Sequence, residues 1–259
     1  LKNLKLHHAL SDGVYISGNS SDIIGEFIES SNNGRQGISI IHGSNIQFTN
    51  SKFNSNGDTE GSYGGHSPKA GLDIEPAGAG NGVNNVLFRK CEFRNNVGSQ
   101  IIITKPVTTS NITISDCVID AGESNGAYQL ILAGSKVTVS HNKINCGPGS
   151  IYAIWNKFPV SELRLIDNFL ESSGAGIMSA AKKFGAKVTI ENNTIHYTGT
   201  KPVRKYFPYI IADIDFIENK VIVPRLRKGG VNSLVKVKRM KGNTFTSGNQ
   251  TFRPNVKVK

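Results

Sequence analysis

The chain has 259 residues, 37% of them hydrophobic, and a formal net charge of +11. No apolar run approaches the roughly 18 residues of a membrane-spanning helix, so we expect no insertion into a membrane. The three cysteines match no zinc-site spacing and argue against a disulfide-stapled scaffold, and we expect neither a metal nor a cofactor.

The first residues, LKNLKLHHAL, lie within a repeating pattern and carry no signal peptide. We therefore expect residues 1–259 to form one domain that is a fragment of a longer chain.

Short segments along the chain share a pattern in which one outward-facing residue lies between two inward apolar ones. They are GVYI (13–16), GISI (37–40), GLDI (71–74), QIII (100–103), QLIL (129–132), YAIW (152–155) and GIMS (176–179). Their outward residues form one column: Tyr15, Ser39, Asp73, Ile102, Ile131, Ile154 and Met178. The column changes from polar to apolar along the chain. Apolar residues on the outside of a fold need a cover, which a partner subunit or a long turn would supply.

Apolar strand positions recur about every 25 residues along this chain, but Ile46 and Val86 are 40 residues apart. This is the one break in the repeat. The excess is DTEGSYGGHSPKAG, residues 58–71, a polar and glycine-rich stretch that we interpret as an insertion loop. Repeat proteins often place such insertions on the binding face. The loop leads directly into AGLDIEP, so we expect it to form one wall of a groove beside that segment.

Two acids, Asp73 and Glu75, lie two apart on the strand expected in AGLDIEP and so point to the same side. Mutual repulsion would leave a general acid beside a base, and the spacing permits either retaining or inverting glycosidase geometry. We predict that both are catalytic. The structural alternative is an acid pair braced by Arg35 from the coil below and Lys105 from the coil above.

Five further residues are candidates for binding a substrate. Arg35 and Lys105 offer cations, His42 and His66 offer titratable rings, and Tyr15 lies in the same outward column as Asp73. For each of them the alternative is an ordinary surface or turn position.

A repeat of about 25 residues dominates the rest of the chain. The segments NVLFRKCEF (85–93), NITISDCVI (111–119), KVTVSHNKI (136–144), ELRLIDNFL (162–170), KVTIENNTI (187–195) and DIDFIENKV (213–221) begin their apolar pattern at intervals of 26, 25, 26, 25 and 26 residues. The alternation is strand-like and no amphipathic helix is evident. This period predicts an all-β fold, a single-stranded right-handed parallel β-helix.

One small residue recurs inside each repeat: Cys91, Cys117, Asn142, Asn168, Asn193 and Asn219. In a β-helix these side chains would stack about 4.8 Å apart inside the core. We expect the asparagines to form a hydrogen-bonded ladder, which makes them structural. A disulfide between Cys91 and Cys117 is geometrically open, but two buried thiols are the preferred interpretation.

The succession GRQGISIIHGSNIQFTNSKF, a polar loop and AGLDIEP resembles the β-helix of phage tailspikes and pectin-lyase-like proteins, among them tail and pre-neck appendage proteins of phages of Gram-positive bacteria. The resemblance covers most of residues 10–245. It implies a trimeric spike on the virion that acts outside the host on a surface glycan or teichoic acid. The polygalacturonase and pectate lyase signatures are absent, so the catalytic residues of those families do not transfer.

The charge is concentrated at the end of the chain. Residues 201–259 hold 14 Lys and Arg against 3 Asp and Glu, whereas the preceding 200 residues hold 16 of each sign. This asymmetry indicates an anionic partner such as teichoic acid, or else a solubilising surface. Nucleic acid is disfavoured because no aromatic stacking platform is interleaved with the basic residues.

Three functions remain open from the sequence: a spike enzyme that depolymerises a surface glycan, a non-catalytic adhesin that binds the same polymer, and a purely structural spike segment. A secreted bacterial β-helix polysaccharide lyase is a further alternative. Neither the glycan nor the choice between hydrolysis and elimination follows from the residues.

Overall fold

The computed structural model describes residues 1–57, 67–77, 80, 82–105, 108–122, 124, 126–153, 162–179, 187–200, 209–211, 214–224, 235–248, 250–251 and 256–258. Within these ranges every regular element is a strand. No helix among them is long and apolar enough to cross a membrane.

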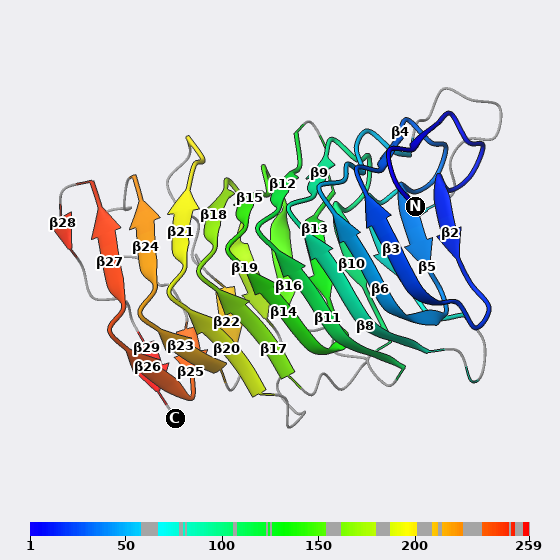
Figure 1. Cartoon of the computed structure of the whole chain (residues 1–259). Helices are drawn as coiled ribbons and strands as arrows, with labels where there is room; N and C mark the ends of the chain where they lie inside the picture. The colour runs from blue at the N-terminus through cyan, green and yellow to red at the C-terminus, as the bar shows by residue number, and fades with distance from the viewer. Residues whose placement is uncertain are drawn as a thin grey trace.

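Three parallel sheets run the length of the molecule, and each coil of the chain adds a strand to one sheet after another (Figure 1). Sheet 1 contains ten strands: β2 (Val14–Ile16), β5 (Ile38–Ile40), β7 (Leu72–Ile74), β10 (Ile101–Ile103), β13 (Tyr128–Leu132), β16 (Ser150–Ala153), β19 (Gly176–Ser179), β22 (Tyr209–Ile211), β25 (Val235–Val237) and β29 (Val256–Val258). Sheet 2 contains nine: β3 (Ser21–Glu26), β6 (Gly43–Thr49), β8 (Val83–Arg89), β11 (Thr109–Ser115), β14 (Ser135–Ser140), β17 (Glu162–Ile166), β20 (Lys187–Glu191), β23 (Ile214–Ile217) and β26 (Arg239–Lys241).

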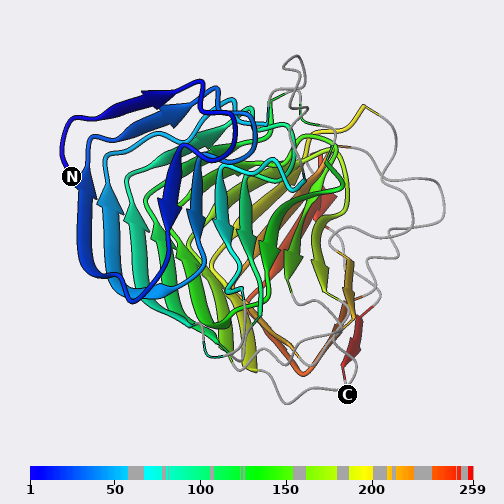
Figure 2. The same cartoon turned by 90° about the vertical axis from the view of Figure 1, so that its right-hand side faces the viewer.

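Sheet 3 contains eight strands: β9 (Glu92–Arg94), β12 (Val118–Asp120), β15 (Lys143–Asn145), β18 (Phe169–Ser172), β21 (Thr194–Tyr197), β24 (Lys220–Val223), β27 (Thr244–Ser247) and β28 (Gln250–Thr251). The last of these turns back and pairs antiparallel with β27. At the other end β1 (Lys5–His7) pairs in parallel with β4 (Glu29–Ser31), which single bridges through Lys52 connect to β9. Figure 2 shows the coils nested one behind another along a common axis.

The predicted right-handed parallel β-helix is confirmed. The repeat maps onto sheet 2, where Val86, Ile112 and Val137 pair on successive strands, and Leu163, Val188 and Ile214 continue the column. A constant period produces parallel pairing because each strand returns to the same register one coil later. Inward side chains fill the core as stacks, for example Phe48 on Phe88 with ring centroids 5.3 Å apart.

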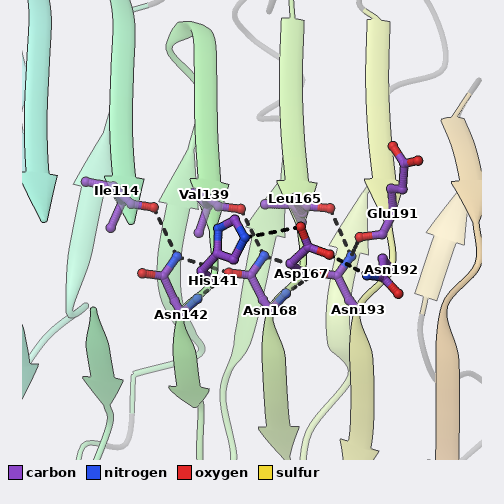
Figure 3. A network of polar contacts seen from close by, with 10 residues as sticks. All are labelled: Ile114, Val139, His141, Asn142, Leu165, Asp167, Asn168, Glu191, Asn192 and Asn193. Atoms are coloured by element: carbon purple, nitrogen blue, oxygen red, sulfur yellow. Dashed lines mark hydrogen bonds and ion pairs between the residues drawn. The ribbon is translucent and has the colours of Figure 1, made fainter. Parts of the chain in front are cut away.

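The predicted asparagine ladder is also confirmed. Asn142, Asn168 and Asn193 are buried at the corner between sheets 2 and 3 (Figure 3). The amide oxygens of Asn168 and Asn193 accept from the asparagine one coil before, and that of Asn142 accepts from the main-chain N–H of Cys117. Each amide nitrogen also donates to a main-chain oxygen, that of Ile114 or Val139 in the first two cases. The ladder extends through Asn219 to Asn243.

The cysteines occupy the same column as the ladder asparagines. Cys91 and Cys117 are buried free thiols, as preferred from the sequence. The sulfur of Cys117 accepts from the main-chain N–H of Cys91 at 3.3 Å and contacts the carbonyl of Phe88 at 3.6 Å. A thiol thus occupies the position that an amide takes in later coils, and it makes weaker hydrogen bonds there.

The residue before each ladder position has a left-handed backbone, which makes the sharp corner. Its φ lies between +52° and +57° at Lys90, Asp116, His141, Asp167, Asn192 and Glu218. Asn and Asp tolerate this conformation better than most residues, which accounts for part of the high asparagine content.

A second buried ladder lies at another corner and was not expected from the sequence. Asn33 donates to the amide oxygen of Asn56, and Asn56 donates to that of Asn96, each at 2.9 Å. Gln100 and Gln129 then continue the row. A side chain on Gly71 would collide with Asn96, since a Cβ there would lie 2.6 Å from its amide nitrogen. The glycine that opens GLDI is therefore required by this ladder.

One register prediction was wrong. In the register of sheet 1 the β16 residue that pairs with Ile131 and Met178 is Tyr152, not Ile154. Alternation alone could not distinguish the two registers, because the sequences IYA (151–153) and AIW (153–155) both have apolar residues on either side of the central one. Ile154 itself lies outside the described residues.

Candidate functional site

The outward column of sheet 1 brings Asp73 between two neighbours. Its register partners are Ser39 on β5 and Ile102 on β10. The carboxyl group lies on the outer face of the sheet, yet Asp73 is only 5% exposed. Tyr15 precedes Ser39 in the same column and is 55% exposed.

The carboxyl group of Asp73 has one hydrogen-bond partner among the described residues. The amide nitrogen of Gln36 donates to its Oδ2 at 2.8 Å, and its buried Oδ1 has none. Burial, and secondarily the charge of Glu75, raise the pKa of Asp73 from its ordinary value of 3.8 to about 7. A carboxyl group in this state carries a proton close to neutral pH.

Glu75 lies one residue beyond the end of β7 and is exposed to solvent. Its carboxylate is 3.7 Å from the ammonium group of Lys105, which also donates to the carbonyl of Pro76 at 2.5 Å. Lys105 therefore contacts one member of the acid pair, as the bracing alternative requires.

Arg35 does not contact Asp73, which corrects its expected place beside the acid. It binds Asp12 through two bonds of 2.8 and 2.9 Å, and Ser39 donates to the same carboxylate at 2.8 Å. The Asp12 side chain is 4% exposed. Arg35 binds the nearly buried carboxylate of Asp12, on the coil below, in preference to Asp73, because two parallel hydrogen bonds hold a guanidinium group more strongly than one.

The two histidines are placed unequally. His42 lies half-buried in the turn after β5, next to the turn that carries Glu75, since the Glu75 N–H donates to the Ile40 carbonyl. His66 and most of the insertion loop, residues 58–66, lie outside the described residues. The expected groove wall is therefore neither confirmed nor contradicted.

Two residues of the apolar part of the column, Ile102 and Ile131, are covered by the chain itself. Ile102 and Ile131 are 7% and 9% exposed, and they form a small cluster with Ala70 and the partly buried Tyr128. This cluster lies outside sheet 1, next to Asp73, and supplies the low-dielectric surroundings of the carboxyl group.

The residues that complete the site are Asp12, Gln36 and Ser39. Sequence reasoning placed Ser39 in the outward column beside Asp73 but assigned no role to Gln36. The signal was present in RQGIS, where an amide precedes the strand one coil below GLDI. The 40-residue spacing concealed it, because the insertion separates Gln36 from Asp73 in sequence.

No group of three or more His, Cys, Asp or Glu side chains among the described residues could hold a metal ion. The basic end is only partly described: residues 201–208 and 225–234 lie outside, whereas Lys238, Arg239 and Lys241 are exposed. Arg239 is paired with Asp215 at 3.2 Å.

The sequence matches the family described as "Right handed beta helix region" over residues 1–170, and the chain belongs to that family. Members of this family commonly bind or degrade polysaccharides. No curated protein and no solved structure matches the sequence.

Proposed function

We propose that this chain is the β-helix of a phage tail spike or appendage that binds a host cell-surface polysaccharide or teichoic-acid-like polymer and cleaves it. In this proposal the complete protein is a homotrimer on the virion and acts outside the host cell. The family's common activity on polysaccharides and the resemblance of residues 10–245 to phage spikes support it.

One observation carries the enzymatic part: two acids only two residues apart, one in β7 and one just beyond its end, have contrasting surroundings. Asp73 is buried with a pKa raised to about 7, whereas Glu75 is exposed beside Lys105. Pairs of acids whose environments diverge in this way divide into proton donor and base. Asp73 would donate a proton to the leaving oxygen, and Glu75 would act as base or nucleophile. Elimination needs the same two roles, so the assignment holds for a hydrolase or a lyase.

Two features support a sugar polymer as the ligand. The exposed ring of Tyr15 lies two strands from Asp73, about 10 Å along the axis, and offers an apolar face on which a sugar ring can stack. The exposed basic residues Lys238, Arg239 and Lys241 suit a polymer that carries phosphate or carboxylate groups.

A second candidate, a non-catalytic adhesin, is favoured by the burial of Asp73. A proton donor must reach the substrate, and this side chain is enclosed by Gln36, Ser39 and Ile102. If the acid only braces the surface, the polymer binds and is released unchanged.

The test uses Asp73→Asn and Glu75→Gln, which are nearly isosteric, on purified host cell-wall polysaccharide and teichoic acid. We expect both variants to bind the polymer and each to lose cleavage by a factor of about 100 or more. Glu162→Gln is the matched control, because Glu162 also pairs with a lysine, Lys187, at 4.0 Å on another sheet. New reducing ends without ultraviolet absorbance indicate hydrolysis, and an absorbing unsaturated product indicates elimination.

Binding of the polymer without any cleavage by the wild type would support the adhesin and exclude the enzyme. Full cleavage by both variants would place the catalytic groups elsewhere.

A further inference from the structure

A chain of polar side chains links Asp73 to the surface. Arg35 donates twice to Asp12, Ser39 lies 2.8 Å from the same carboxylate, and the Ser39 hydroxyl also contacts the amide oxygen of Gln36. The other end of that amide reaches Asp73 at 2.8 Å. Gln36, Ser39 and Asp73 are buried. The Asp12 side chain is nearly inaccessible to solvent as well.

The hydroxyl of Ser39 cannot satisfy both of its neighbours. A serine hydroxyl has one proton, and here it faces two acceptors, the carboxylate of Asp12 and the amide oxygen of Gln36. With the Gln36 nitrogen turned toward an ionised Asp73, one of these two oxygens receives no proton from Ser39. Two oxygens in contact without a proton between them repel each other.

A half-turn of the Gln36 amide removes the conflict. Its nitrogen then donates to Ser39, Ser39 donates to Asp12, and the amide oxygen faces Asp73. That arrangement has one requirement, which is that Asp73 carries a proton to donate to the amide oxygen.

We infer that Asp73 is held in its neutral form by a one-directional hydrogen-bond chain through Gln36 and Ser39 to the Arg35–Asp12 pair, and that ionisation of Asp73 is coupled to reversal of the Gln36 amide. Gln36 and Ser39 are then positioning residues for the proton of Asp73.

The surrounding charges agree with this assignment. The charged groups that act on Asp73 are Glu75, just beyond the end of its strand, and Arg35 and Asp12 from the coils below, and the coil above contributes the apolar Ile102. Arg35 is occupied by Asp12, and the nearest cation above, Lys105, is occupied by Glu75. No described cation contacts Asp73 directly. Its Oδ1 is also unpartnered within the described part of the chain, which costs less for a neutral acid than for a carboxylate.

This inference deepens the proposed function, in which Asp73 is the proton donor, but its test needs no substrate. The pKa of Asp73 is measured by carbon NMR of aspartate-labelled protein, with Asp73→Asn used to assign the signal. An infrared band of a protonated carboxyl group, present near pH 6 and absent in Asp73→Asn, gives a second readout.

Two substitutions should both lower the pKa of Asp73. Ser39→Ala removes the acceptor conflict of the ionised state and should lower the pKa by about one unit or more. Gln36→Met keeps the shape but removes the amide oxygen that accepts the Asp73 proton, and with it the chain that holds the acid neutral, so it should lower the pKa as well. Ser172→Ala is the control, because this buried hydroxyl donates to Gly149 far along the chain and should leave Asp73 unchanged.

An Asp73 that is fully ionised at pH 6 in the wild type would overturn the inference, as would a raised pKa of Asp73 in Gln36→Met, which would show that Gln36 stabilises the carboxylate instead. If Gln36→Met fails to fold, Ser39→Ala alone decides, since an unchanged pKa excludes the coupling. Absence of glycan cleavage would contradict the proposed enzymatic function, but it would not affect the inference about the protonation of Asp73.

Discussion

The side-chain oxygen of Asn168 accepts two hydrogen bonds from Asn142, one from its main-chain N–H and one from its amide, each at 3.0 Å. One buried side chain therefore satisfies two donors of the preceding coil, and its own amide nitrogen satisfies the carbonyl of Val139. The corner between sheets 2 and 3 depends on this repeated exchange, because its polar groups are shielded from water.

Replacing Asn168 by Leu should destabilise the fold by about 2–4 kcal/mol. The substitution leaves the main-chain N–H of Asn142 and one hydrogen of its side-chain amide buried without acceptors, and it removes the Asn168 donor to the Val139 carbonyl, which no gain in apolar burial offsets. Urea unfolding followed by circular dichroism measures the change. Arg164→Leu, on the exposed face of the same coil, is the control and should differ little from wild type. Equal stability of the two variants would contradict a structural role for the ladder.

The cysteine positions should accept asparagine. In Cys117→Asn the new amide oxygen would accept from Cys91 N–H, and its nitrogen would donate to Phe88, as Asn142 does to Ile114. We expect stability equal to or above that of wild type. Cys117→Ala instead leaves the Cys91 N–H without an acceptor and should lose about 1–3 kcal/mol. Midpoints from guanidinium unfolding decide the order, and an alanine variant as stable as the asparagine variant would refute it.

The raised pKa of Asp73 predicts a specific dependence of stability on pH. Between 3.8 and about 7 the unfolded chain is ionised at this position while the folded chain keeps its proton, so the folded state binds more protons. The free energy of unfolding should therefore fall as the pH rises through this window and then level off. The interval corresponds to an upper limit of about 4 kcal/mol.

Asp73→Asn mimics the neutral acid and should abolish this loss. The variant should match wild type near pH 4 and exceed it at pH 8, whereas Asp116→Asn, an exposed control, should follow the wild-type curve. A constant difference between Asp73→Asn and wild type across the whole range would show that Asp73 ionises as an ordinary carboxyl group.

The homotrimer stays a prediction for the complete protein, and sedimentation equilibrium tests it. Its motive from the sequence was the apolar outward column, of which Ile102 and Ile131 are already covered within one chain. A subunit contact would therefore use the column beyond them, where Met178 is partly exposed. Met178→Asp should weaken a trimer that uses this surface. A complete protein that sediments only as a monomer would contradict the prediction.

The periodic part of this protein was determined by its sequence. Spacings of 25 and 26 residues place Val86, Ile112 and Val137 in one column, and the same arithmetic stacks Asn142 on Asn168, because a β-helix repeats its register at every coil. The spacing of the repeats therefore predicts both the β-helix fold and the ladder of asparagines inside it.

Only the tertiary structure showed which residues meet where the regular spacing of the repeats is interrupted. The 40-residue step from Ile46 to Val86 hid the contact between Gln36 and Asp73, and it hid the second ladder from Asn56 to Asn96. Likewise, the choice of Arg35 between two carboxylates depends on their burial and on bidentate geometry, which no spacing encodes. Whether an acid on the outer face of a strand is exposed or enclosed is set by the coils on either side of it, and that is a property of packing in three dimensions.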